Sequence, residues 1–254
     1  MTTRFICNAL ICTLIFASFS VSIPSGFNAL SIGEESSSAN GDASDELGWI
    51  STAGGAQNDF ITGTVSFSNQ SIITAGWFEG DIQFRDQIDG FGATGGSQDS
   101  DFFIAWLNGE GNWTSAIQGG SSGFDTVEAI AVLPNNDVVV AGSYCINSVG
   151  ESCQLVLGDL DPLPKNSANE NGNAFLARMS STGEWMWSTQ IGNQHEVFVV
   201  DMIITEVQEI HLAIQFRETL EFNGETIPGS DQYAVLVAVF DETGAVLSHV
   251  SVET

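Results

Sequence analysis

Apolar and polar residues alternate with a period of two along much of the chain after residue 48. Residues 72–78 are interpreted as an alternating strand with counterparts at residues 138–144 and 210–216. Residues 209–215 place apolar side chains on one face and mostly polar or small ones on the other, as is typical of strands that present one apolar face. Short stretches rich in Gly, Asn, Asp and Ser separate the apolar runs, as turns between antiparallel strands do. No segment has a convincing helical period. The pattern therefore predicts an all-β fold.

The strands belong to a unit that recurs along the chain. An alanine followed six residues later by glycine marks the end of one strand and the turn after it, and tryptophans recur near another position of the unit. These landmarks are Ala105 and Gly111, Ala177 and Gly183, Ala238 and Gly244, and Trp49, Trp113 and Trp187. Units of about sixty residues with four short strands are typical of β-propeller blades. We therefore predict tandem four-stranded antiparallel blades, about three in number, in a β-propeller-like arrangement.

The landmarks place a repeat domain at residues 48–254, with units at about 49–111, 112–183 and 184–244. In the first unit, residues 82–84 are expected to join residues 102–107 in one strand. Residues 245–252 are expected to form the first strand of a fourth unit. Closed propellers need about four or more blades, so three alternatives stay open: a ring completed by association of chains, an open stack, or a chain truncated relative to longer relatives. We favour homo-oligomeric completion or truncation, because an open stack leaves strand edges free to pair.

The middle unit carries an insertion. Tyr144 matches Phe78 and Phe216, but the next equivalent strand ends thirteen residues later instead of six. Cys145 and Cys153 lie within this excess. An insertion at a turn, closed by a disulfide, explains both observations. The sequence thus predicts a Cys145–Cys153 disulfide.

The segment before the repeats differs in character. Within residues 1–30, the positively charged Arg4 is followed by the apolar run 5–16 and then by small residues. This pattern is typical of a signal peptide, and the alternative is an uncleaved N-terminal anchor. Residues 31–47 contain little to bury and are expected to form an acidic flexible linker. We predict a secreted or cell-surface protein, in which the oxidising compartment favours the disulfide.

Charge is strongly unbalanced, with 32 Asp and Glu against 5 Lys and Arg and a formal net charge of −27. Repulsion disfavours binding to nucleic acid or to an anionic membrane surface. Contact with a membrane is expected only through the N-terminal segment, if it is not cleaved.

Candidate sites are few. Asp99 with Asp101, and Asp159 with Asp161, place oxygen ligands at a spacing that suits Ca²⁺, but they lack the full calcium-loop pattern. Turn formation by Asp is the favoured alternative, so we predict no catalytic, cofactor or firm metal site. Asn69 and Asn112 begin glycosylation sequons, and whether they carry glycans stays open.

Several runs resemble the secreted "beta-propeller repeat" family of bacteria and archaea (SBBP type). The resemblance lies in residues 75–84, 100–107, 172–179 and 216–229 and extends from about Trp49 to the end of the chain. It implies a secreted or cell-surface repeat protein, usually without known catalysis, and supplies no functional residues. The chain departs from the pattern in the excursion at residues 160–172, and Ala234 takes the position of Asp101 and Asn173.

We therefore expect a non-catalytic binding or surface-interaction module with a protein or glycan partner. The alternatives are a carbohydrate-active or quinone-dependent propeller enzyme and a structural fragment of a larger surface protein. Residues 177–187 are similar to the blade-docking motif of quinone dehydrogenases, with Met179 where that motif prefers Asp. That motif fastens blades together and is not catalytic, so it does not by itself argue for an enzyme.

Overall fold

The computed structural model describes residues 49–67, 69–85, 88–96, 99–148, 152–165, 172–192 and 195–252. The chain divides into two units, Met1–Asp45 and Glu46–Thr254, and all described residues belong to the second. The predicted signal segment 1–30 and linker 31–47 lie outside the described residues.

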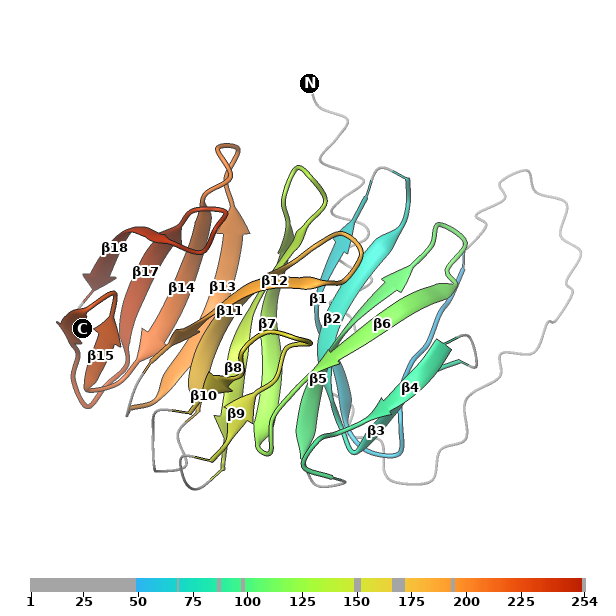
Figure 1. Ribbon diagram of the computed structural model, residues 1–254, viewed down its shortest axis with the longest axis horizontal. Helices are drawn as coiled ribbons and strands as arrows, with labels where there is room; N and C mark the ends of the chain where they lie inside the picture. The colour runs from blue at the N-terminus through green and yellow to red at the C-terminus, as the bar shows by residue number, and fades with distance from the viewer. Residues whose placement is uncertain are drawn as a thin grey trace, which may run out of the picture. The chain divides into compact units, whose positions relative to one another are not determined.

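The described residues are all-β, and twelve strands form three four-stranded antiparallel sheets (Figure 1). The first sheet contains β1 (Asp59–Ser66), β2 (Ile72–Glu79), β5 (Ser100–Leu107) and β6 (Trp113–Gly119). The second contains β7 (Phe124–Val132), β8 (Val138–Ile146), β11 (Asn173–Met179) and β12 (Trp185–Ile191). The third contains β13 (Val197–Ile204), β14 (Ile210–Phe216), β17 (Ala234–Phe240) and β18 (Val246–Val252). In each sheet the strands lie in chain order.

A two-stranded hairpin is inserted between the second and third strands of every sheet. The hairpins are β3 (Asp81–Phe84) with β4 (Ile88–Gly92), β9 (Gln154–Leu155) with β10 (Leu163–Pro164), and β15 (Thr219–Phe222) with β16 (Glu225–Pro228). The expected continuation of residues 82–84 into residues 102–107 is therefore wrong. Residues 81–84 pair with β4, and Ile82 and Phe84 are buried beside the first sheet.

Register confirms that the three alanine landmarks are equivalent. Each alanine faces the third residue of the second strand: Ala105 pairs with Thr74, Ala177 with Val140 and Ala238 with Leu212. The three positions at the start of the third strand correspond in the same way: Asp101 pairs with Phe78, Asn173 with Tyr144 and Ala234 with Phe216. The register therefore shows that the three sheets repeat one four-stranded arrangement.

The unit boundaries need correction. The strands after the glycine landmarks, β6, β12 and β18, pair with the strands before them and complete the same sheet. Strand β18 is therefore the fourth strand of the third sheet and not the first strand of a fourth unit. The sheets span residues 59–119, 124–191 and 197–252. A short turn lets adjacent strands pair directly. Each landmark glycine therefore lies in a turn between two strands of one sheet, and not between two sheets.

The tryptophan alignment is also wrong in part. Trp113 and Trp185 both follow the landmark turn and pair with the last residue of the preceding strand, Leu107 and Met179. Trp187 lies two residues further along β12. In its contacts Trp49 resembles Trp187 and not Trp113. The Trp49 and Trp187 indole nitrogens donate to backbone carbonyls of landmark turns, at Gly109 (3.1 Å) and Glu242 (3.1 Å).

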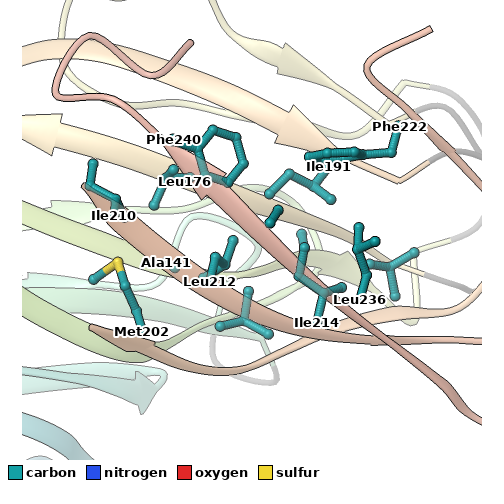
Figure 2. Close-up of a cluster of buried hydrophobic side chains, with 14 of the residues drawn as sticks. Ala141, Leu176, Ile191, Met202, Ile210, Leu212, Ile214, Phe222, Leu236 and Phe240 are labelled. Atoms are coloured by element: carbon teal, nitrogen blue, oxygen red, sulfur yellow. The ribbon is translucent and has the colours of Figure 1, made fainter. Parts of the chain in front are cut away.

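Apolar clusters fill the spaces between successive sheets. One joins Ala141 and Leu176 of the second sheet to Leu212, Ile214 and Leu236 of the third, and all five side chains are buried (Figure 2). A second cluster joins the first sheet to the second, and a third covers the other face of the first sheet. A sheet face is therefore buried where a neighbouring sheet lies against it, and the second sheet, between the other two, is buried on both faces.

The disulfide prediction is confirmed. Cys145 and Cys153 are bonded, and both are buried beside the β9–β10 hairpin. A structural disulfide is typical of extracytoplasmic proteins. Over the residues described, no helix is long and apolar enough to cross a membrane.

Candidate interaction surface

The strongest calcium candidate among the predicted residues is held by the protein's own donors. Asp101 is fully buried, and its Oδ2 accepts hydrogen bonds from the Thr94 backbone (3.1 Å), the Thr94 hydroxyl (2.6 Å) and the Gln118 amide. Asp99 is buried, and its Oδ1 accepts from the Ser100 backbone at 3.1 Å. Burial raises the pKa of both carboxyls. These contacts fit a structural role at the start of β5.

A buried carboxylate that the sequence reasoning missed lies near them. Asp125 is fully buried and accepts from the Ser121 backbone (2.6 Å), the Ser121 hydroxyl (2.7 Å) and the Cys145 backbone (2.9 Å). Burial raises its pKa well above the usual range, and the charge of Asp101 adds to the effect. Asp59 repeats the motif in the preceding unit, since its carboxylate accepts from the Gly55 backbone at 2.8 Å. In both cases the backbone donor lies four residues before an aspartate at the start of the first strand, and this spacing was the available signal.

The second calcium candidate lies elsewhere. Asp159 and Asp161 are exposed between β9 and β10. Within the described ranges, no group of three or more His, Cys, Asp or Glu side chains could hold a metal ion. The four aspartates thus do not converge on one metal centre.

The two sequon asparagines lie in turns of the first sheet. The Asn69 side chain is exposed between β1 and β2 and accepts from the Ser71 backbone at 3.0 Å. Asn112 is half-buried between β5 and β6.

Side chains at repeated positions connect each sheet to the landmark turn of the next. From the second sheet, Trp187 lies over Gly244, where an added methyl group would be 3.0 Å from the ring. Arg178 donates to the carbonyl of Glu242 in the same turn (2.5 Å) and forms a buried ion pair with Asp137 at 2.6 Å. From the first sheet, Trp106 and Ile117 lie beside Gly183, 3.5 Å and 3.7 Å from a methyl group placed there.

The register identifies the corresponding residues of the third sheet. In every sheet one residue of the third strand faces the first residue of the second strand. The residue directly before it is Trp106 in the first sheet, Arg178 in the second and Val239 in the third, so these three positions correspond. In the fourth strand, Val250 pairs with Val237 as Ile117 pairs with Ile104. Val250 is 60% exposed. The third sheet thus carries apolar side chains at the positions that elsewhere contact a following sheet.

These residues belong to a surface that is mainly apolar, which we call the outward face of the third sheet. Paired residues of antiparallel strands share a face, and the register assigns the members. They are Phe198, Asp201, Ile203, His211, Ala213, Gln215, Val235, Val237, Val239, Ser248 and Val250. Asp201 is the one carboxylate among them, and Ile203 is 57% exposed. Apolar faces of this kind mark interaction sites.

The equivalent face of the second sheet is buried. Val139 and Ala141 correspond to His211 and Ala213 through their register with the third strands, and both are fully covered beside the third sheet. The outward face of the third sheet is therefore the exposed copy of a surface that is covered in the preceding unit. The sequence contained the signal in the continuous run 234–240, which is apolar on both faces and is typical of a strand buried on both sides.

Comparison with models of known protein families gives no match, and comparison with curated proteins gives no significant match.

Proposed function

We propose that the three sheets are blades of a β-propeller-type array, and that the protein is an exported, acidic, non-catalytic interaction module. The first strands of the three sheets support this arrangement, because β7 lies against both β1 and β13. Innermost strands of successive blades are neighbours in the same way. The resemblance to secreted propeller-repeat proteins agrees with the proposal.

The proposed interaction takes place on the outward face of the third sheet. It presents Val235, Val237 and Val239 in the centre of a four-stranded sheet, next to the exposed Ile203 and Val250. A partner that covers these side chains removes apolar surface from water, which stabilises the complex. We therefore place the partner-binding surface there.

Export is supported by the buried disulfide and by the signal-like character of residues 1–30. The test is expression of the full chain in a bacterial host with an export pathway. We expect the chain outside the cytoplasm, and mass spectrometry of its N-terminus should find cleavage after residue 17 to 30. Retention in the cytoplasm with reduced cysteines would contradict export.

Binding is tested on the exported chain with a glycan array and with the purified chain itself as probes. Val237→Asp places a charge in the centre of the outward face, while Val207→Asp places one on a residue that is 72% exposed in the β13–β14 turn. We expect saturable binding that survives Val207→Asp and is lost in Val237→Asp. Binding unaffected by either change, or turnover of glycosides or quinone-linked dyes by the exported chain, would contradict the proposal.

A further inference from the structure

The two ends of the array differ in how they are covered, and this difference limits what can bind to the outward face. On the first sheet, residues 49–55 occupy the place that an outer strand of a preceding sheet would take. Trp49 lies over Gly111, where an added methyl group would be 2.3 Å from its ring. Trp187 of the second sheet contacts Gly244 of the third in the same way. We call residues 49–55 the N-terminal cap.

Several hydrogen bonds attach the cap to the first unit. Gly54 and Gln83 exchange backbone hydrogen bonds of 3.0 Å and 3.1 Å, as an isolated bridge. The Trp113 indole donates to the carbonyl of Thr52 at 3.0 Å, and Arg85 donates to that of Ile50 at 3.2 Å. Gly120, directly after β6, forms the same kind of bridge with Val156, which lies between β9 and β10 of the second unit. The cap therefore reproduces the contacts of an outer strand.

A capped first sheet obstructs head-to-tail stacking. A second copy placed with its third sheet against this first sheet would bring its β18 to the position of the cap. Stacking in that direction requires displacement of the cap, and a heterologous contact of this kind gives rings or filaments. The outward face has no such cap within residues 49–252 as described, since Ile203 and Val250 are more than half exposed.

We infer that the outward face is covered by the same face of a second copy, in a closed two-fold dimer. The inference rests on the proposed function, because it names the partner of the proposed binding surface. A two-fold contact needs a surface that complements itself. A mainly apolar sheet face, with Asp201 and the His211–Glu209 pair (3.3 Å) as its ionisable groups, meets this condition. Face-to-face packing about 10 Å apart is a standard arrangement of two antiparallel sheets.

Charge gives the dimer a distinctive salt dependence. The chain carries a formal net charge of −27, while the outward face contains one carboxylate, Asp201. Two copies therefore repel each other through charges outside the contact, and salt screens this repulsion. Dimerisation should become stronger as salt rises, the opposite of the response of a contact held by ion pairs.

The experiment is sedimentation velocity of the exported chain at low and high micromolar concentration and at low and high salt. We expect a reversible dimer favoured by salt, retained in Val207→Asp and converted to monomer by Val237→Asp. Trp49→Ala should loosen the cap and give species larger than the dimer. Circular dichroism and thermal melting establish that each variant is folded, so that loss of the dimer is not loss of the fold.

A wild-type chain that stays monomeric at all concentrations and salts, or a Val237→Asp chain that still dimerises, would overturn the inference. The two proposals fail differently. If the wild type is monomeric but Val237→Asp abolishes binding to the glycan array, only the second copy is wrong as the partner. If Val237→Asp changes neither association nor binding, the outward face is not the interaction surface.

Discussion

At the scale of single residues, Arg178 joins three parts of the molecule. Its guanidinium donates to Asp137 in the β7–β8 turn of its own sheet (2.6 Å) and to the carbonyl of Glu242 in the next sheet (2.5 Å). Burial alone would raise the pKa of Asp137, but hydrogen bonds from Arg178 and Asn135 hold that pKa below its usual value. The Arg178–Asp137 pair lies within the second sheet, and the hydrogen bond from Arg178 to Glu242 links that sheet to the third.

Replacement of Arg178 by alanine should destabilise the protein strongly. It leaves Asp137 without its charge partner in a mostly buried position, and breaking such a pair costs about 3–5 kcal/mol. Arg217→Ala is the control, because the more exposed pair of Arg217 with Glu196 at 3.4 Å should contribute less than about 1 kcal/mol. Urea denaturation measures both. Equal losses in the two variants would show that the Arg178 pair has no special role.

Two partly buried carboxyls determine the predicted pH dependence of stability. Burial raises the pKa of Glu128 from 4.5 to about 7 and that of Asp59 from 3.8 to about 6. Between the ordinary and the raised values, the folded state holds protons that the unfolded chain has released. Stability is therefore fully present at the acidic end of this window and falls as pH rises through it.

Glu128→Gln should remove part of this fall. Between pH 5 and pH 8 the native chain should lose stability, with Glu128 contributing up to about 3 kcal/mol. The variant cannot ionise at this position and should lose less over the same range. The measurement is the urea midpoint at the two pH values. An equal fall in both chains would show that Glu128 ionises without cost.

At the scale of elements, the landmark turns close the third and fourth strands of each sheet and receive side chains from elsewhere. Gly111, Gly183 and Gly244 have φ of 78°, 88° and 83°, in the left-handed region that other residues adopt at a cost. The similar φ values at the three glycines allow the destabilisation caused by a contacting tryptophan ring to be separated from that caused by backbone strain.

Alanine substitutions in these turns should therefore differ. Gly183→Ala adds a methyl group 3.5 Å from Trp106, an ordinary contact, and should cost about 1–2 kcal/mol for backbone strain alone. Gly111→Ala places the methyl group 2.3 Å from the Trp49 ring and should cost more while releasing Trp49. Urea denaturation and tryptophan fluorescence report the two effects. A Gly111→Ala chain with native fluorescence would contradict the contact of Trp49 with this turn.

At the scale of the whole molecule, a stack of sheets buries apolar faces between neighbours while a net charge of −27 opposes compaction. The polar ends of the sheets hold the buried carboxylates, and Asp101 and Asp99 accept hydrogen bonds from the chain itself.

Salt should therefore stabilise the protein through screening, with no specific requirement for calcium. The melting temperature should rise with KCl, and CaCl₂ at the same ionic strength should give an equal rise. Asp101→Asn serves as the matched variant, because it removes a charge at the stronger of the two calcium candidates. A larger rise with CaCl₂ that disappears in Asp101→Asn would establish a calcium site at the start of β5.

The sequence by itself determined the strands, the repeat and the disulfide. Alternation with period two and glycine-closed turns are local properties, so residues 72–78, 138–144 and 210–216 could be assigned as equivalent strands without knowledge of their partners. The seven-residue excess with Cys145 and Cys153 was visible because it interrupts that local spacing.

Only the tertiary structure decided how strands are grouped and which faces are covered. Pairing of β18 with β17, the separate hairpins, and the contact of Trp49 with a turn sixty residues away depend on hydrogen bonds between distant segments. A strand of given pattern fits the edge of either neighbouring sheet, so its sequence does not specify its partner. The apolar run 234–240 is likewise typical of a strand buried on both faces, but the sequence does not specify what covers each face. In the structure its outward side chains belong to a surface that is available to a partner.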